Sequence, residues 1–232
     1  RMRLLASQGE LPDVMEMSSG FLEGWATDGF LYDITSYINE SEEADEFYPS
    51  LLESARSIAG TDEYYALSYA FVMPVMYFNK DMFDEAGISY PDEDWSWNDF
   101  LDAANSLTVD NNDDGEIDQW GHHFYGRYAQ IEPWIFSNDG ALIDREDMRF
   151  DPDSNAEEAL EFLTSLVLEH EVAPPPKSVA ELDTEQVFAQ EISAMWVDGS
   201  WNIDSMRDSV GDRFEWGIAP VPTGPSGSGQ QV

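Results

Sequence analysis

Cysteine is absent from this 232-residue sequence, and lysine and arginine are scarce. Without thiols the chain can form no disulfide, carry no thiolate nucleophile and build no cysteine-based zinc site. Only 10 basic residues face 48 aspartates and glutamates, which gives a formal net charge of −38 at pH 7. A field of this sign repels nucleic acids and anionic lipid surfaces, so we expect neither as a partner.

Long apolar runs are also missing. No stretch approaches the roughly 20 apolar residues that a helix needs to span a bilayer, and no signal peptide opens the chain. The start reads as the last turns of a helix closed by Gly9, and residues 224–232 read as a flexible linker rather than a phosphate-binding loop. We therefore expect part of a longer protein, incomplete at both ends, whose export signal and membrane anchor precede residue 1.

What the sequence does contain is enough apolar material for a folded core. Hydrophobic residues make up 42% and aromatic residues 13% of the chain, whereas disordered acidic chains lack aromatics. The acidic residues must therefore lie on the surface of a globular protein. Self-repulsion at this charge destabilises the compact state in dilute buffer, and molar salt shortens the screening length to roughly 3 Å. This composition predicts a protein from an organism that lives in very high salt.

Short strands alternate with helices along the chain, a pattern typical of an α/β fold. Pro74 lies within an apolar, β-like stretch and should mark a strand edge, a bulge or a crossing between two sheets. Ser96 and Asp99 form a candidate capping box at the start of a helix. Strands are expected at residues 12–17, 64–78, 194–198 and 216–222. Helices are expected at residues 21–37 with a break at Gly29, 41–57, 79–87, from 96 onward, 156–170, 184–190 and 201–206.

The order of these segments resembles the extracellular solute-binding proteins of carbohydrate importers, family 1, the group that includes maltose-binding protein. Four stretches carry the resemblance and together span nearly the whole chain. They are residues 9–14 with Gly29, residues 77–88, Glu132-Pro-Trp134 before Asp139-Gly140, and residues 188–201. One departure is Glu191, which stands where the family often has glycine.

The resemblance implies a two-lobed, type II periplasmic-binding-protein-like fold of the α/β class. It places residues 1–73 in the first lobe and 74–216 in the second, with 217–232 returning to the first. It also implies an extracellular, monomeric binding protein that needs no cofactor, closes by hinge bending around a carbohydrate and delivers it to a membrane permease of an ABC transporter.

Candidate ligand-binding residues follow from the same resemblance. Glu132, Trp134 and Trp201 match residues that contact sugar in maltose-binding relatives. Asp198 and Gly199 end a predicted strand just before Trp201. Further candidates come from neighbouring loops: Tyr69, Tyr125 and Tyr128. Physically, aromatic rings stack on the C–H faces of a pyranose, and carboxylates accept hydrogen bonds from its hydroxyls. The alternative for each tryptophan is ordinary core packing, and for each acid a solvated surface.

One acidic loop has the spacing of an EF-hand-type calcium site. Its oxygen-bearing residues fall at positions 1, 3, 5, 7 and 9 of the motif, with Gly115 at position 6. These residues are Asp110, Asn112, Asp114, Glu116 and Asp118. The glutamate usual at position 12 is replaced by Gly121. The sequence leaves two interpretations open: a structural calcium site, or a solvated acidic turn.

Two other functions are compatible with these residues. A polyamine or another cationic ligand would suit Glu132, Asp198 and Trp201 through carboxylate pairing and cation–π contact. A glycoside hydrolase would need Glu132 and Asp198 as a pair separated by roughly 5–9.5 Å, one of them with a raised pKa. The pair His122-His123 has no motif of a metal site around it, and we expect these histidines to be structural. The sequence favours a sugar-binding protein and not an enzyme.

Overall fold

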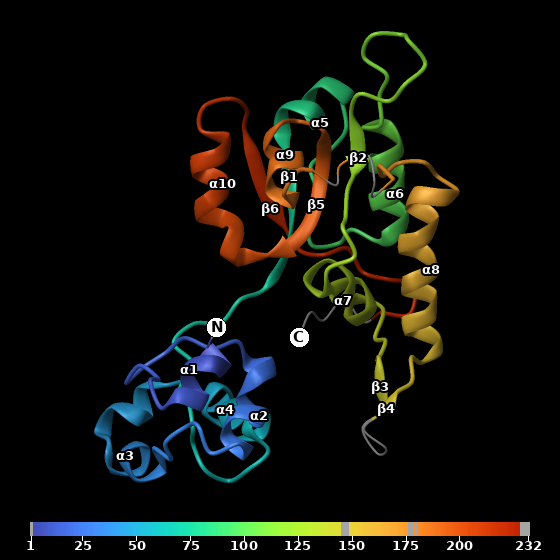
Figure 1. Cartoon of the computed structure of the whole chain (residues 1–232). Helices are drawn as coiled ribbons and strands as arrows, with labels where there is room; N and C mark the ends of the chain where they lie inside the picture. The colour runs from blue at the N-terminus through green and yellow to red at the C-terminus, as the bar shows by residue number, and fades with distance from the viewer. Residues whose placement is uncertain (1, 145–148, 176–178, 180, 228–232) are drawn as a thin grey trace. The chain divides into compact units, whose positions relative to one another are not determined.

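The structure is a computed structural model that describes residues 2–144, 149–175, 179 and 181–227 (Figure 1). The chain divides into two compact units, residues 1–71 and residues 72–232. We predicted the first boundary after residue 73, two residues later. The units are described separately below.

The regular elements among the described residues of the first unit are all helices, joined by irregular segments. Gly9, with φ +72°, ends the first helix, and Gly29, with φ +74°, ends another, as the sequence predicted. The strand predicted at residues 12–17 is wrong, and so is the part of the 64–78 strand that precedes Pro74. A strand needs a partner for its backbone N–H and C=O groups, and the described part of this unit provides no neighbouring strand. Its helices are α1 (Met2–Gln8), η1 (Ser19–Phe21), α2 (Leu22–Thr27), α3 (Thr35–Glu40), η2 (Glu42–Glu46) and α4 (Pro49–Ala59).

A mixed four-stranded sheet forms the centre of the second unit. Its order is β2-β5-β1-β6, with β1 antiparallel to both of its neighbours and β2 parallel to β5. Pro74 is the first residue of β1, a position that requires no ladder hydrogen bond from it. The strands are β1 (Pro74–Asn79), β2 (Trp120–His122), β5 (Ser193–Gly199) and β6 (Trp216–Ala219), and β3 (Ile143–Asp144) pairs with β4 (Arg149–Phe150) in a separate hairpin.

Local capping chemistry sets the ends of several helices in this unit. The Asn79 side chain caps α5, and Gly87, with φ +67°, ends it. Ser96 and Asp99 form the predicted capping box of α6. The helices are α5 (Lys80–Ala86), α6 (Trp97–Ser106), α7 (Tyr128–Ser137), α8 (Ser154–Leu168), α9 (Thr184–Ala189), η3 (Ser200–Asn202) and α10 (Ile203–Val210). Of these, α7 was not predicted from the sequence.

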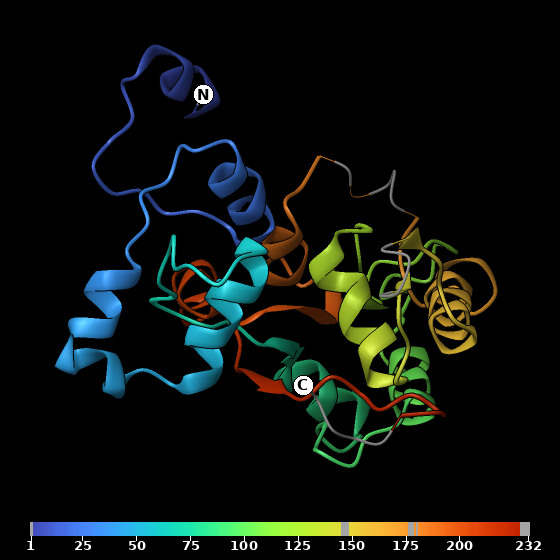
Figure 2. The same cartoon turned by 90° about the horizontal axis from the view of Figure 1, so that it is seen from below.

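Helices cover both faces of the sheet (Figures 1 and 2). Alternate residues of β1 point to opposite faces, as a pleated strand requires. Met76 and Phe78 pack in a core with α5, α6, α7 and α8, whereas Val75 and Tyr77 pack in a second core with α9 and α10. This layered α/β arrangement confirms the predicted fold class for residues 72–227.

The end of the chain does not behave as predicted. We expected residues 217–232 to return to the first lobe and residues 224–232 to be a flexible linker. Instead β6 pairs with β1, and the Thr223 and Gly224 amides donate to the carbonyls of Trp95 and Ser137, both at 2.9 Å. These backbone bonds hold residues 216–227 on the second unit. Residues 228–232 lie outside the described residues.

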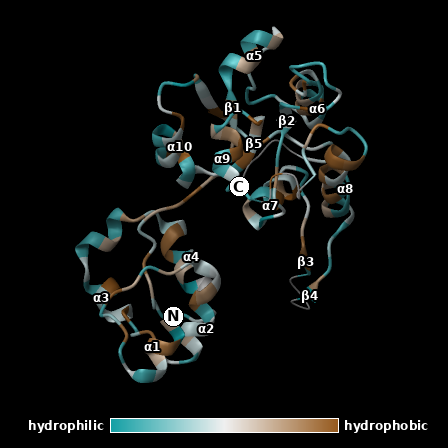
Figure 3. Cartoon of the chain, turned by 45° about the horizontal axis from the view of Figure 1, so that its top comes forward, coloured by the Kyte–Doolittle hydropathy of each residue, from teal (hydrophilic) through white to brown (hydrophobic). Residues whose placement is uncertain are grey.

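The acidic side chains lie mainly on the surface and are mainly unpaired. Among the described residues only three ion pairs occur, and the carboxylate of each is more than half exposed. Helices such as α8 carry both hydrophobic and hydrophilic residues, with the hydrophobic ones directed to the core (Figure 3). The fold therefore leaves most of the net charge of −38 uncompensated by neighbouring bases.

Candidate functional site

A small cavity of about 220 Å³ lies where β5 ends and β1 begins. Pro74, the first residue of β1, pairs with Gly199, the last residue of β5, so both lie at the same end of these two antiparallel strands. Ligands of open α/β sheets bind at such strand ends. The cavity is lined by Val72, Met73, Pro74, Tyr128, Ala129, Glu132, Pro133, Phe136, Gly199 and Trp201, all of the second unit. Four predicted ligand-binding residues therefore come together here: Tyr128, Glu132, Gly199 and Trp201.

One face of α7 forms a wall of this cavity. Tyr128, Glu132 and Phe136 are spaced four residues apart, which places them above one another on a helix. Trp134 follows Glu132 by two residues and hence points to the opposite side of the helix. Its side chain is fully buried and packs edge-on against Phe100 with ring centroids 4.8 Å apart. The prediction that Trp134 contacts a ligand is thus corrected: it is a core residue.

Trp201 and Gly199 also line the cavity. Trp201 is 43% exposed, so part of its surface is open to contact. A Cβ atom at position 199 would collide with the ring of Trp201, which means that glycine is needed there for space. Aromatic surface held in this way suits the apolar face of a sugar ring.

Hydrogen bonds fix the strand ends around the cavity. The Met73 amide donates to the Ser200 hydroxyl at 3.2 Å, and the Ser200 amide donates to the Met73 carbonyl at 2.8 Å. The buried Tyr77 hydroxyl donates to the Gly199 carbonyl at 2.8 Å, and burial raises the pKa of Tyr77 well above its usual range. These bonds fix the start of β1 relative to the end of β5 beside the cavity.

Asp198 lies beneath the cavity and not in it. Its side chain is fully buried, accepts a hydrogen bond from the Gly199 amide at 2.7 Å, and accepts another from the Gln130 side chain at 3.2 Å. Burial raises the pKa of Asp198, while the hydrogen bonds and Arg127 oppose that rise. The prediction of direct ligand contact is corrected for this residue, because it has no exposed surface. Asp198 instead ties α7 to the end of β5.

Glu132 is the single carboxylate that lines the cavity. Its side chain is half-buried, and this burial alone raises its pKa. Neither a hydrogen bond nor an ion pair to its carboxylate is recorded within the described part of the chain. A carboxylate in this setting is available to a ligand that donates hydrogen bonds or carries positive charge.

The remaining tyrosine candidates lie elsewhere. The Tyr125 hydroxyl is within hydrogen-bonding distance of the carbonyls of Val179 (2.7 Å) and Leu182 (3.0 Å), so it fastens a loop and does not line the cavity. Tyr69 belongs to the first unit, where its exposed hydroxyl donates to Glu16 at 2.6 Å. A ligand contact from Tyr69 stays a prediction.

Sequence reasoning missed several residues of the cavity, above all Phe136 and Met73. The four-residue spacing from Tyr128 through Glu132 to Phe136 was the available signal. Pro133 weakens that signal, because proline within a helix removes one backbone hydrogen bond. Met73 carries no sequence signal of its own, because only its pairing with Ser200 brings it to the site.

The calcium-like loop at residues 110–118 is held by its own backbone. Asp110 accepts hydrogen bonds from the amides of Asn112, Asp114 and Gly115, and these bonds lower its pKa. Within residues 2–144, 149–175, 179 and 181–227, no group of three or more His, Asp or Glu side chains is placed to hold a metal ion. Calcium binding by this loop stays a prediction, and so does its alternative, a solvated acidic turn.

The two neighbouring histidines are core residues. His122 and His123 are both fully buried, and burial lowers each pKa to about 3. His122 lies against the Met195 carbonyl, and His123 lies between the Ser193 hydroxyl and the Thr184 carbonyl. They are neutral packing groups at neutral pH, in line with the structural role expected of them.

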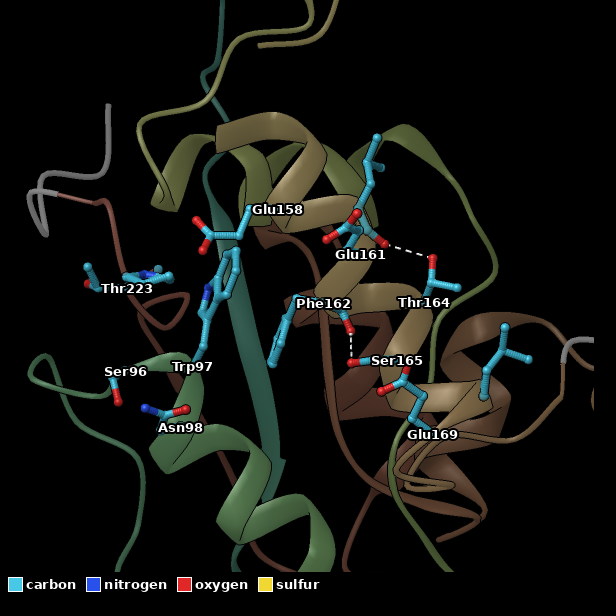
Figure 4. A pocket seen from close by; sticks show the side chains of 14 residues that line it. Ser96, Trp97, Asn98, Glu158, Glu161, Phe162, Thr164, Ser165, Glu169 and Thr223 are labelled. Carbon is cyan, nitrogen blue, oxygen red and sulfur yellow. Dashed lines mark hydrogen bonds between the residues drawn. The ribbon is translucent and has the colours of Figure 1, made fainter. Parts of the chain in front are cut away.

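A larger groove, of about 870 Å³, opens between the start of α6, α8 and residues 223–225 (Figure 4). Trp97 and Phe162 stack within it at 4.5 Å. The Trp97 indole N–H donates to the Ser137 hydroxyl at 3.3 Å. The rim carries three exposed glutamates: Glu158, Glu161 and Glu169. None of the predicted ligand-binding residues lines this groove, so the smaller cavity is the candidate site.

The candidate site is thus a cavity at a strand end of an α/β unit, lined by aromatic rings and one carboxylate. The family model described as bacterial extracellular solute-binding protein matches residues 1–232, and the chain belongs to this family. A binding protein of Brucella abortus (strain 2308) is 23% identical over 231 residues, which cover 96% of this chain and 52% of that protein. The chain thus spans about half the length of the curated relatives it matches.

Solved structures show the same fold. An ABC substrate-binding protein from Listeria monocytogenes in complex with cycloalternan is 28% identical, with a TM-score of 0.79 over 97% of this chain and 56% of that one. The GacH receptor of Streptomyces glaucescens, solved with acarbose, is 20% identical with a TM-score of 0.76 over 97% and 56% of the two chains. These likenesses confirm the predicted type II solute-binding fold, of which this chain is a part.

Proposed function

We propose that the protein containing this chain captures a carbohydrate outside the cell and delivers it to the membrane permease of an ABC importer. The observation that carries the proposal is a single cavity lined by both the exposed residue Trp201 and the carboxylate-bearing residue Glu132. A sugar needs both an aromatic surface for its C–H face and an acceptor for its hydroxyls. The cycloalternan complex of the Listeria relative supports a carbohydrate as ligand.

The cavity supports binding rather than hydrolysis. A glycoside hydrolase needs two carboxylates on either side of the bond it cleaves. Here Glu132 lines the cavity, whereas Asp198 is fully buried and bonded to Gln130 and the Gly199 amide. One accessible carboxylate suits a receptor that holds its ligand unchanged.

We also propose a setting for this receptor. The family is extracellular, and an anchor in a preceding segment would keep a monomeric receptor near its permease. No helix of the described residues is long and apolar enough to cross a membrane. The net charge of −38, with so few ion pairs on the surface, favours life in molar salt.

The test is a thermal-shift screen of the full protein in molar KCl against mono-, di- and oligosaccharides, with polyamines in parallel. A ligand at a hundredfold excess over its Kd stabilises the native state by about 2.7 kcal/mol, an easily measured shift. We expect one class of sugar to raise the melting temperature in the parent protein and not in Trp201→Ala. A shift from polyamines alone would replace the carbohydrate by a cationic ligand.

A further inference from the structure

The ionisable groups that line the candidate cavity carry charge of one sign only, which is negative. Glu132 is its single ionisable carboxylate, and no lysine, arginine or histidine lines it. Burial is the only cause that raises the pKa of Glu132, so no neighbouring cation stabilises the charged form. Keeping a half-buried carboxylate charged without a counter-ion costs free energy in the empty protein. A ligand that supplies a positive charge offsets this cost, so it should bind more favourably than a neutral ligand.

The rest of the lining also favours a cation. Tyr128, Phe136 and Trp201 are 67%, 52% and 43% exposed, so their rings are accessible. The faces of aromatic rings attract ammonium groups, tryptophan most strongly.

The size of the cavity limits what it can hold. Its volume of about 220 Å³ is smaller than the roughly 300–1,000 Å³ of pockets for drug-sized ligands. The part of a ligand that lies inside this cavity is therefore about as large as a single sugar ring or a small headgroup. The cavity can therefore discriminate between ligands only by the one ring or headgroup that it encloses.

We propose that the cavity selects a ligand group with a positively charged nitrogen, such as the ammonium of an amino sugar, over its neutral or acidic counterpart. The choice of a sugar rests on the proposed function. The same recognition chemistry occurs in an amino sugar and in a choline-type headgroup, and the experiment below separates these two sources.

Titration calorimetry on the full protein tests this selection. The probes are glucose, mannose and galactose, each as the neutral sugar, the 2-amino sugar, the N-acetylated sugar and the uronic acid, with choline and spermidine as non-sugar cations. Measurements in molar NaCl screen the general negative field, so a remaining preference belongs to short-range contacts. We expect the amino sugar of one series to bind at least about tenfold more tightly than the neutral sugar, about 1.4 kcal/mol, and the uronic acid to bind weakest.

Two variants assign this preference to the cavity. Glu132→Gln keeps the shape of the side chain and removes its charge, and we expect the ratio of amino-sugar to neutral-sugar affinity to fall towards one. Glu161→Gln makes the same change in charge at the rim of the other groove and should leave the ratio as it is. Equal melting temperatures would show that both variants are folded.

The outcomes separate the two proposals. Neutral sugar bound as tightly as its amine would overturn the inference and leave the sugar receptor standing. Choline or spermidine bound alone, with loss in Glu132→Gln, would support the inference and overturn the carbohydrate. An unchanged ratio in Glu132→Gln, or no binding by any probe, would overturn the inference.

Discussion

The ring of Trp201 lies directly over Gly199, with no space for a side-chain carbon at position 199. The backbone of Gly199, with φ −75° and ψ 153°, is open to any residue. Glycine is therefore required by close approach and not by conformation. The last residue of β5 thus determines where the aromatic wall of the cavity stands.

The first prediction concerns Gly199→Ala. The added methyl group must displace the indole, so we expect at least tenfold weaker ligand binding and a loss of about 1–3 kcal/mol in stability, typical of overpacking. Calorimetry and chemical denaturation measure the two effects. Gly20→Ala is the control, because a Cβ atom there meets no atom within 4 Å. Parent-like affinity in Gly199→Ala would contradict the position of the ring.

The second prediction concerns salt. With 48 acidic residues, 10 basic ones and three ion pairs among the described residues, lowering the salt should unfold the protein. We expect circular dichroism to show loss of structure as KCl falls from molar to about 0.1 M, where the screening length reaches about 10 Å. A protein that is fully folded in dilute buffer would contradict the halophilic interpretation.

The third prediction concerns Glu191, which follows the C-cap of α9 with φ +62°. This left-handed conformation favours glycine. We expect Glu191→Gly to raise the free energy of unfolding by about 0.5–1 kcal/mol. Gly87→Ala, at the matching position of α5 with φ +67°, should lower it. No gain in Glu191→Gly would mean that the glutamate makes a compensating contact.

The fourth prediction concerns acid stability. His122 and His123 have their pKa lowered from 6.5 to about 3 by burial, so the unfolded chain binds protons that the native state excludes. Their contribution to stability is present above pH 6.5 and is lost as the pH falls towards 3, by up to about 1.4 kcal/mol per pH unit for each histidine.

His122→Phe should make that loss shallower, because the ring lies 5.1 Å from Phe100 in an aromatic core that a phenyl group suits. Urea midpoints between pH 7 and pH 4 measure the slope. The exposed His170 is the control, and His170→Gln should keep the parental slope. Identical slopes in all three proteins would show that the buried histidines do not control this acid sensitivity.

The fifth prediction concerns the loop at residues 110–118. Asp110 accepts three backbone hydrogen bonds, so Asp110→Ala should lower the melting temperature in the presence of a chelator. Calcium added to the chelated parent protein should leave its melting temperature unchanged, because no group of three or more His, Asp or Glu side chains in the described residues is placed to hold an ion. A rise with calcium would show that the loop rearranges into an ion site.

Segments whose ends depend on nearby residues were predicted correctly from the sequence. Asn79 and Gly87 cap the two ends of α5, and Ser96 with Asp99 caps the start of α6. Such ends can be predicted because capping involves groups within a few residues of one another. The strand at residues 194–198 was also found, since its apolar run is buried on both faces. The predicted strand at residues 12–17 failed because a strand needs a partner that local sequence does not supply.

The sequence alone determined the charge, the absence of thiol chemistry, the α/β class and the resemblance to sugar receptors, all of which depend on composition and local order. Only the tertiary structure decided which candidates reach the ligand. Glu132 and Trp134 are two residues apart, yet the turn of α7 sends one to the cavity and the other to the core. Asp198 and Trp201 are three apart, yet the sheet buries the first and exposes the second. Burial depends on which segments meet in space, and that is a property of the packed chain as a whole.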